Sequence, residues 1–363
     1  MNSSSVSRRT VLKAFGAGSL ALGASGLLAA CSSSASTKST SKSGSGPKTT
    51  SQLRVSLGWV KDIEFAGFWL ALDRGYYQDE GLDVNFIGGG TNTPLPHVQL
   101  AAGSADIAVD PSMLQLLQVI PQGNDLVLLG AVYQTDPTGL LSLAKHPVRS
   151  AADLPGLKIL SQQGTQPLLN ALYKANHLTP NYDFIPAGFD PGALVQGQGQ
   201  AYNCFVTNQP ITLEQKFGMK AGKDYFAVTY GDLGCPAYAN VIACKRTLLD
   251  ARRKDLEGFM RASVRGWQDN AADPTAAVKL VVDKFGVDLG LDQKQQAREN
   301  ELQIPLTQSA LTKAHGLLRV DPGIMRTTMY PWLKLADAGN LPDPSQIVDT
   351  SVLDAVFKNG ATV

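Results

Sequence analysis

The segment Gly58–Gly81, GWVKDIEFAGFWLALDRGYYQDEG, joins the end of a predicted strand to an aromatic-rich helix. From Phe65, apolar residues recur at i, i+3, i+4 and i+7, which predicts a helix over 63–74 with one buried face. Gly75 follows the helix at the position where a left-handed cap is favoured. The segment therefore predicts a strand–helix unit whose apolar stripe packs into a core, made of Phe65, Phe68, Trp69 and Leu72.

The same alternation of short strands and amphipathic helices continues along the chain. Strands are predicted at 53–59, 82–87, 105–109, 156–160, 183–188 and 201–206, and helices at 96–102, from about 112, and at 164–175, with a helix or turn at 192–198. After Ala243 the pattern is helical, at 248–270, 273–285, 291–302, 307–316 and 321–338. This order predicts an α/β fold with mainly parallel sheets and ligands at the carboxyl ends of their strands.

The pattern also predicts two α/β lobes, the second inserted into the first. We expect lobe 1 to contain 52–137 and 240–363, and lobe 2 to contain 138–239. The chain is expected to cross between the lobes near 134–141 and 238–243. A length of 363 residues with 44% hydrophobic residues is sufficient for two such cores.

Residues 1–30 have the features of an export signal. SRRTVLK resembles the twin-arginine motif, with Arg8 and Arg9 as the pair, and a modest apolar run follows. Leu28–Cys31 resembles a bacterial lipobox, so Cys31 is the expected site of lipidation. The alternatives are a simple signal peptide cleaved elsewhere and an uncleaved anchor. Residues 31–51, rich in Ser, Thr and Lys, predict a flexible tether.

Charge and cysteine content exclude some classes of function. Six of the 32 Lys and Arg residues precede Ser51, which leaves 26 basic against 31 acidic residues and a net charge of −5. A mildly acidic body is unsuited to nucleic acid. The remaining cysteines, Cys204, Cys235 and Cys244, show no C-x-x-C pair, so no metal site is predicted. Cys235 and Cys244 are either a disulfide or buried thiols.

Four motifs carry a resemblance to a known group of proteins. They are LGWVKDIEFAGFWLALDRGYYQDEGLDV at 57–84, AAGSADIAV at 101–109, PAYAN at 236–240 and RGW at 265–267. Together they resemble the ABC-transporter substrate-binding proteins that include binders of thiamine-pyrimidine precursors, riboflavin, nitrate and alkanesulfonates. The resemblance implies a type II periplasmic-binding-protein fold, with two α/β lobes joined by a two-strand hinge. It also implies an extracytoplasmic, lipid-anchored protein that delivers a small ligand to a membrane permease.

Candidate ligand-binding residues lie at predicted strand ends and crossings, and each also has a structural alternative. Trp59, just past a strand end, either stacks on a flat ligand or packs in the core. Phe65 either lines the same wall or belongs to the core. Gly89 and Gly90 either allow close approach of backbone amides or form a turn, and Asp110 either accepts hydrogen bonds from a ligand or caps a helix.

The second lobe and the crossings supply the other candidates. Gln163, Gly164 and Thr165 lie at a predicted helix start, where they either bind a polar group or cap the helix. Asn203 is either a ligand contact or a turn residue. The candidates near the crossings, which are either cleft-floor contacts or structural residues, are Tyr133, Gln134 and Tyr238.

The sequence thus predicts a binding protein without catalytic residues or cofactor. We expect a small planar heterocycle such as a thiamine-pyrimidine precursor, with sulfonate, nitrate or riboflavin as alternatives. An enzyme related to the pyrimidine synthases is a further alternative, but those enzymes use a cysteine-rich motif and a histidine, whereas Ala201–Phe205 holds a single cysteine. A tethered ligand sensor would use the same cleft.

Overall fold

Two five-stranded sheets organise the part of the chain that the computed structural model describes, residues 50–336 and 339–363. The predicted signal peptide, Cys31 and all but the last two residues of the predicted tether lie outside these residues. The first strand begins at Ser51, one residue before the predicted start of lobe 1. The described residues fall within one compact unit.

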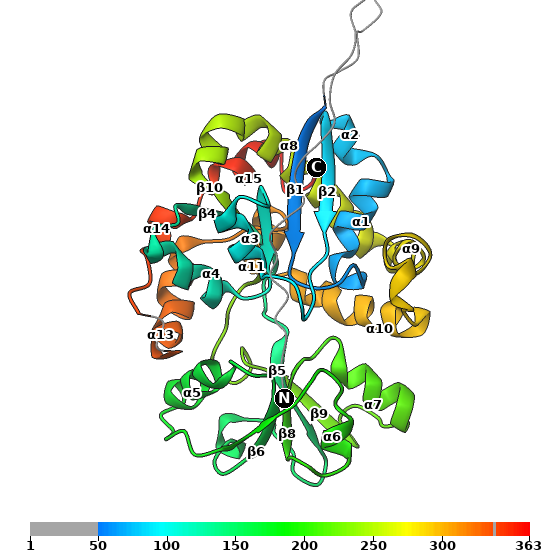
Figure 1. Cartoon of the computed structure of the whole chain (residues 1–363), viewed down its shortest axis with the longest axis vertical. Helices are drawn as coiled ribbons and strands as arrows, with labels where there is room; N and C mark the ends of the chain where they lie inside the picture. Colours follow the sequence, from blue (N-terminus) through cyan, green and yellow to red (C-terminus); the bar gives the residue numbers. More distant parts are fainter. Residues whose placement is uncertain (1–49, 337–338) are drawn as a thin grey trace, which may run out of the picture. The chain divides into compact units, whose positions relative to one another are not determined.

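The first sheet has the strand order β2-β1-β3-β10-β4. β1 pairs in parallel with β2 and β3, whereas β10 runs antiparallel to β3 and β4. Four of the five strands therefore run in one direction, in agreement with the predicted mainly parallel sheet, and β10, which returns last, makes the sheet mixed by running in the opposite direction. Its strands are β1 (Ser51–Leu57), β2 (Leu82–Ile87), β3 (Ile107–Asp110), β4 (Leu126–Tyr133) and β10 (Ala239–Lys245) (Figure 1).

The second sheet has the order β7-β6-β8-β5-β9. β6 pairs in parallel with β7 and β8, and β5 runs antiparallel to β8 and β9. Its strands are β5 (Thr138–Leu143), β6 (Lys158–Ser161), β7 (Asp183–Pro186), β8 (Ala201–Phe205) and β9 (Tyr225–Thr229). The chain passes from the first sheet to the second over 134–137 and returns over 230–238.

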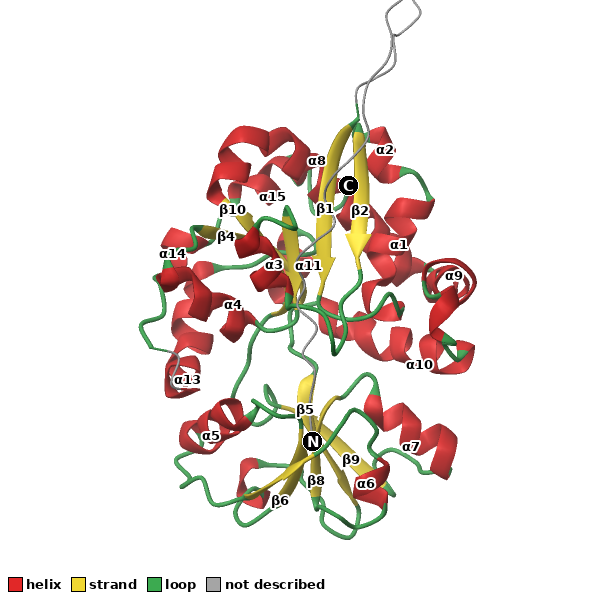
Figure 2. Ribbon diagram, viewed as in Figure 1, coloured by secondary structure: helices red, strands yellow, loops and turns green. Residues whose placement is uncertain are grey.

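Helices flank both sheets (Figure 2). In chain order they are α1 (Ala66–Asp73), α2 (Tyr76–Asp79), α3 (Pro96–Ala102), α4 (Met113–Val119), α5 (Gln166–Ala175), α6 (Gly192–Val195), α7 (Gln209–Phe217), α8 (Arg246–Ala272), α9 (Pro274–Leu280), α10 (Gln293–Gln303), α11 (Ala310–His315), α12 (Pro322–Ile324), α13 (Tyr330–Leu333), α14 (Pro344–Ile347) and α15 (Ser351–Val356). Short 3-10 and π turns are η1 (Ile63–Phe65), η2 (Ile120–Gln122), η3 (Ala151–Asp153), η4 (Val281–Phe285), η5 (Val287–Leu289), η6 (Ile304–Thr307), η7 (Met325–Met329) and η8 (Lys334–Ala336).

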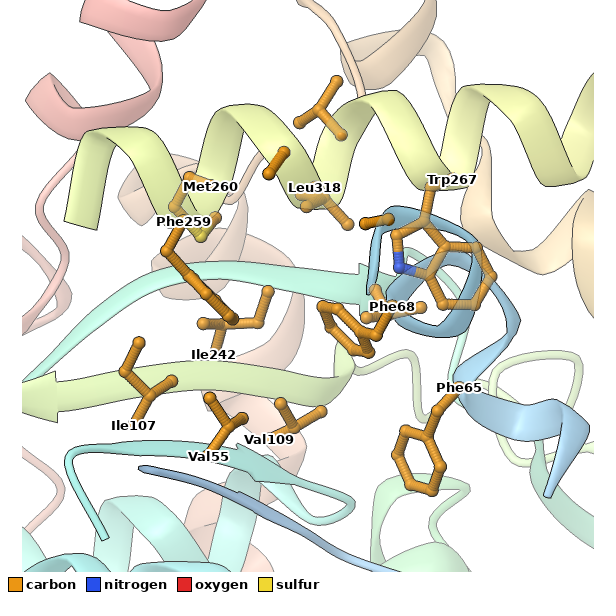
Figure 3. Close-up of a cluster of buried hydrophobic side chains, with 14 of the residues drawn as sticks. Val55, Phe65, Phe68, Ile107, Val109, Ile242, Phe259, Met260, Trp267 and Leu318 are labelled. Atoms are coloured by element: carbon orange, nitrogen blue, oxygen red, sulfur yellow. The ribbon is translucent and has the colours of Figure 1, made fainter. Parts of the chain in front are cut away.

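The opening segment folds largely as its pattern predicts. The Asp62 carboxylate accepts the Glu64 amide at 3.0 Å and caps η1, which leads directly into α1. Gly75 has φ 74°, the left-handed conformation that ends α1. Phe68 packs with Phe259 and Trp267 of α8 in one apolar cluster that also contains Val55 and Ile242 (Figure 3).

Two glycines allow α1 and α8 to pack closely. A Cβ at Gly266 would lie 1.9 Å from the carbonyl oxygen of Gly67, and a Cβ at Gly67 would lie 2.3 Å from the Trp267 ring. Any side chain at either position would separate the helices. This contact holds α1, which begins shortly after Trp59 and Glu64, against α8, the longest helix of the described chain.

Several elements and the state of the cysteines go beyond the sequence prediction. The elements that were not predicted are β4, β9, α2, α7, α14 and α15. Of these, β9 is an edge strand with a half-buried middle and no strict alternation, so its sequence gives little signal. Cys204, Cys235 and Cys244 are free and buried, so Cys235 and Cys244 do not form a disulfide. Over residues 50–336 and 339–363, none of the helices combines the length and apolar character needed to span a membrane.

Candidate ligand-binding site

A cavity of about 400 Å³ lies among segments that follow strands of both sheets. Its size suits a small organic molecule. The lining residues are Gly58, Trp59, Glu64, Leu95, Pro111, Ser112, Met113, Leu114, Gln115, Asp136, Thr138, Gln162, Gln163, Thr165, Leu168, Phe189, Asn203, Cys204, Phe205, Asn208, Gln209, Ala237, Glu299, Trp332 and Leu333.

Aromatic rings form part of the cavity wall. Trp59, which follows β1, and Phe189, which follows β7, have ring centroids 4.9 Å apart and planes inclined at 55°. Phe189 is 45% exposed, so this ring is free to contact a ligand without leaving a core. Trp332 of α13 is held in place by a 2.7 Å hydrogen bond from its indole N–H to the Pro236 carbonyl. Flat faces of this kind favour a ring-shaped ligand.

Amide side chains of the second sheet present directed polar groups. Asn203 on β8 donates from Nδ2 to Gln162 Oε1 at 3.0 Å and accepts the Tyr230 hydroxyl at 2.7 Å. Thr165 donates its hydroxyl to the Gln162 carbonyl at 2.8 Å. The Asn203 and Gln162 side chains thus orient each other, and the Gln162 main chain holds the Thr165 hydroxyl, before any ligand arrives.

Three carboxyl groups line the cavity. Glu64 Oε1 accepts from Asn240 Nδ2 at 2.9 Å, and Glu299 Oε2 accepts from Asn208 Nδ2 at 2.8 Å. Asp136, at the crossing into β5, accepts the Thr138 amide at 2.7 Å. No Lys, Arg or His occurs among the described residues of the lining.

Burial raises the pKa of each of these carboxyls. It raises the pKa of Glu64 to about 7, with the Asn240 hydrogen bond opposing the shift. It raises the pKa of Glu299 to about 8, opposed by Asn208 and reinforced by the charge of Glu64. For Asp136 the pKa rises to about 6 for the same reason. The pKa of Asp62, which does not line the cavity, is also raised. Burial is the largest cause, and the charges of Glu299 and Glu64 follow.

Residues 62–277 match the family described as NMT1/THI5 like. The chain belongs to this family. It is 26% identical over 279 residues to the riboflavin-binding protein RibY of Chloroflexus aurantiacus, covering 74% of this chain and 76% of that protein. It is 25% identical over 243 residues to the formylaminopyrimidine-binding protein of Halalkalibacterium halodurans, covering 63% and 69%. The resemblance predicted from the sequence is confirmed.

Solved structures similar to this NMT1/THI5-like chain confirm the predicted fold. The periplasmic aliphatic sulphonate binding protein SsuA from Escherichia coli matches with a TM-score of 0.62 at 15% identity, over 82% of this chain and 92% of that one. The desulfurization enzyme DSZB matches with a TM-score of 0.52 at 12% identity, over 84% and 98%. At these identities the likeness concerns the fold alone.

Four of the residues predicted for the site in this NMT1/THI5-like chain line the cavity. They are Trp59, Gln163, Thr165 and Asn203. The other predicted residues are not among the described lining. Gly164, with φ 87°, forms the turn between Gln163 and Thr165. Phe65 is fully buried and meets the Trp69 ring edge-on at 6.3 Å.

The remaining predicted residues that end or follow strands of the first sheet have structural partners. Gly89 donates its amide to the Trp59 carbonyl at 2.7 Å, and a Cβ at Gly89 would lie 2.5 Å from the Leu57 oxygen. Its neighbour Gly90 has φ 136°. Asp110 is fully buried and accepts from both the amide and Nδ1 of His97, at 3.0 and 2.7 Å.

The predicted residues at the crossings are buried rather than on the cavity surface. Tyr133 donates its hydroxyl to Gln303 Oε1 at 2.6 Å. Gln134 donates to the Arg319 carbonyl at 2.8 Å. Tyr238 is 2% exposed, and its hydroxyl has no hydrogen-bond partner among the described residues.

Several lining residues in this family member were not predicted. Glu64 lies inside the opening segment, in the η1 turn that follows the end of β1, so the strand-end argument could have indicated it. Phe189 follows β7 just as Trp59 follows β1, so the strand-end argument applied to it as well. Glu299 and Trp332 come from helices remote in sequence, and their approach to the cavity follows only from tertiary packing.

Proposed function

We propose that this chain is the substrate-binding component of an ABC importer and that it captures a small planar heterocycle in the cavity. The observation that carries this is the cavity itself, in which Trp59 after β1 faces Phe189 after β7, with Trp332 nearby. A ligand that packs against these rings would contact residues attached to both sheets at once. The ligand would then favour the closed form of the protein over the open form, because it makes more contacts in the closed form.

The names of the relatives support this class of function. The family relatives at 25–26% identity are named as binders of riboflavin and of formylaminopyrimidine, both flat nitrogen heterocycles. We infer the same type of ligand here because rings rather than cations form the described cavity wall. Sulfonate or nitrate fits less well, since an anion would meet Glu64, Asp136 and Glu299.

We further infer the cellular arrangement. The protein acts outside the cytoplasm, exported by its twin-arginine signal and held at the membrane by a lipid on Cys31, with 31–51 as tether. Lobe 1 consists of 52–137 and 240–363, and lobe 2 of 138–239. Its partners are the small ligand and a membrane permease.

An enzymatic function is the second candidate, because DSZB shares the fold. The pyrimidine-synthase form of this hypothesis needs a histidine and a lysine at the cavity, and neither occurs among its described lining residues. Cys204 lines the cavity, but burial raises its pKa, so the thiol is a poor nucleophile. These observations favour a binding protein.

Thermal-shift screening of the purified protein tests the proposal. Riboflavin, formylaminopyrimidine, an alkanesulfonate and nitrate are added separately, and a rise in Tm with at least one heterocycle is expected. A protein stabilised by none of the four, or one that chemically converts its ligand, contradicts the proposed function.

A further inference from the structure

Three buried carboxyl groups, two in the cavity lining and one close to them in the chain or in space, have no positive partner among the described residues. We call Asp62, Glu64 and Glu299 the acidic wall. Their side chains belong to residues that are 3%, 5% and 3% exposed. None of the three has a Lys, Arg or His within ion-pair distance among the described residues. Buried charges are ordinarily paired, so this arrangement requires an explanation.

The hydrogen bonds of the acidic wall come from neutral donors. Glu64 is bound by the amide of Asn240, and Glu299 by that of Asn208. Asp62 accepts a backbone amide. Each amide satisfies part of one carboxylate, but none supplies a positive charge. The described residues include no group of three or more His, Cys, Asp and Glu able to hold a metal ion.

Asn240 provides an independent sign of a missing partner. It is fully buried, its Nδ2 contacts Glu64, and its Oδ1 has no hydrogen-bond partner among the described residues. Its backbone is also left-handed, with φ 47°, which is uncommon for a non-glycine residue. Exchanging the two amide atoms would leave the nitrogen unpaired instead. A buried acceptor beside Glu64 is thus left without a donor among the described residues, although Asn240 itself is not one of the residues that line the cavity.

The cavity offers the shape that matches a group rich in N–H donors. Trp59 and Phe189 present aromatic faces, and aromatic faces attract cations as well as rings. Glu64 and Glu299 both line the same cavity as these rings. A flat cationic group with several N–H donors can therefore contact carboxylate oxygens at its edge and a ring at its face.

We propose that the ligand carries a flat positive group, an amidinium or a protonated aminoheterocycle, which binds Glu64 and Glu299. This rests on the proposed function and names the class of its substrate. The carboxylates accept the N–H donors of the ligand, and the aromatic rings cover its plane. Anionic ligands are rejected by the same wall, because the described cavity lining has no cation to offset Glu64, Glu299 and Asp136.

Proton linkage gives the proposal a signature. The groups facing the bound cation are Glu64, Glu299 and Asp136 on the lining, with Asp62 and the Tyr133 hydroxyl behind them. The raised pKa values of Glu64 and Glu299, about 7 and about 8, mean that the empty site holds protons at neutral pH. A bound cation favours the ionised forms, so binding releases protons and strengthens as the pH rises from 6 to 8.

Three probes of nearly equal shape and different charge test this inference on the purified protein. Benzamidine is positive, benzamide neutral and benzenesulfonate negative. We expect calorimetry at pH 8 to give benzamidine at least tenfold tighter binding than benzamide, with the ratio narrowing at pH 6. Titration in two buffers of different ionisation enthalpy should show proton release with benzamidine only.

Substitutions locate the effect. Glu64→Gln and Glu299→Gln should each reduce benzamidine affinity tenfold or more and diminish the proton release, and the loss of benzamide affinity should be smaller than the loss of benzamidine affinity. Glu301→Gln is the matched control, since Glu301 lies on the same helix but points outward to Arg298. It should leave all three affinities unchanged.

The outcomes separate this inference from the proposed function. Equal or tighter binding of benzamide or benzenesulfonate overturns the positive charge of the ligand but leaves a ligand-binding protein. Absence of benzamidine binding at millimolar concentration also overturns it. The proposed function then depends on riboflavin and formylaminopyrimidine, and it fails only if these do not bind either.

Discussion

The Trp59 and Phe189 rings lie 4.9 Å apart, although one residue follows the first sheet's β1 and the other follows β7 of the second sheet. Through this pair, an aromatic side chain attached to the first sheet contacts one attached to the second sheet. A ring ligand would either insert beside this pair or separate it. In both cases the indole of Trp59 changes its surroundings.

Trp59→Ala should therefore weaken the binding of any ring ligand tenfold or more, and Phe189→Ala should do so to a similar degree. Loss of one aromatic contact removes about 0.5–1.5 kcal/mol beyond the lost burial, which supplies the rest. Calorimetry with the best ligand from the thermal screen measures this change. Phe217→Ala, at a 43% exposed phenylalanine on α7, is the matched control and should leave affinity unaltered. Equal loss in the control would show a general effect on folding.

Asn208→Ala should destabilise the protein and raise the pKa of Glu299 further. Asn208 precedes α7 and donates at 2.8 Å to Glu299 on α10, so its loss leaves a buried carboxyl without that donor. The expected cost is about 1–3 kcal/mol in the free energy of unfolding, measured by urea denaturation. Asn208→Asp should be worse at pH 8 than at pH 5, because two carboxylates then repel. A pH-independent Asn208→Asp effect would contradict the assigned contact.

Gly266→Ala should lower stability by about 1–3 kcal/mol, because the added Cβ would meet the Gly67 backbone oxygen and overpack the α1–α8 contact. Thermal unfolding monitored by circular dichroism is the measurement. Gly188→Ala is the control, since nothing lies within 4 Å of a Cβ at that position. Unchanged stability of Gly266→Ala would mean that α1 and α8 separate at little cost.

The ligand-free protein should lose stability as the pH rises from about 5 to 8.5. Glu64 and Glu299 have pKa values in the folded protein of about 7 and about 8, above the ordinary 4.5 of the unfolded chain. The folded state therefore binds more protons than the unfolded state across this range, and each pKa unit corresponds to about 1.4 kcal/mol. Urea denaturation at a series of pH values tests this. Glu299→Gln should flatten the curve, and a curve that rises with pH would be inconsistent with a proton-holding site.

Local signals in the sequence predicted the elements with the clearest patterns. The alternation over 82–87 and the helix 96–102 ending before Gly103 match β2 and α3 to the residue. These elements are specified by their own side chains and by a glycine with φ 75°. By contrast β9, at the edge of its sheet, depends on pairing with β5 and carries little pattern of its own.

The site was harder to predict than the fold. A strand end indicates which edge of the sheet a residue occupies, and this argument located Trp59 and Asn203 on the cavity. It does not say whether the side chain turns toward ligand or protein, and Asp110 turns toward His97. Glu299 lies on α10, which begins nearly two hundred residues after β3 ends. The local sequence around Glu299 therefore cannot indicate that its side chain reaches the cavity.

The second sheet is built from one uninterrupted stretch, β5 to β9, bounded by the short connections 134–137 and 230–238. That stretch contributes Phe189, Asn203 and Asn208 to the cavity, whereas the flanking chain contributes Trp59 and Glu64. A large part of the cavity lining therefore comes from one continuous segment that is joined to the first sheet by two connections. Exchanging this segment for the equivalent piece of a relative would recombine binding preferences in a single genetic step, with the original first sheet left intact.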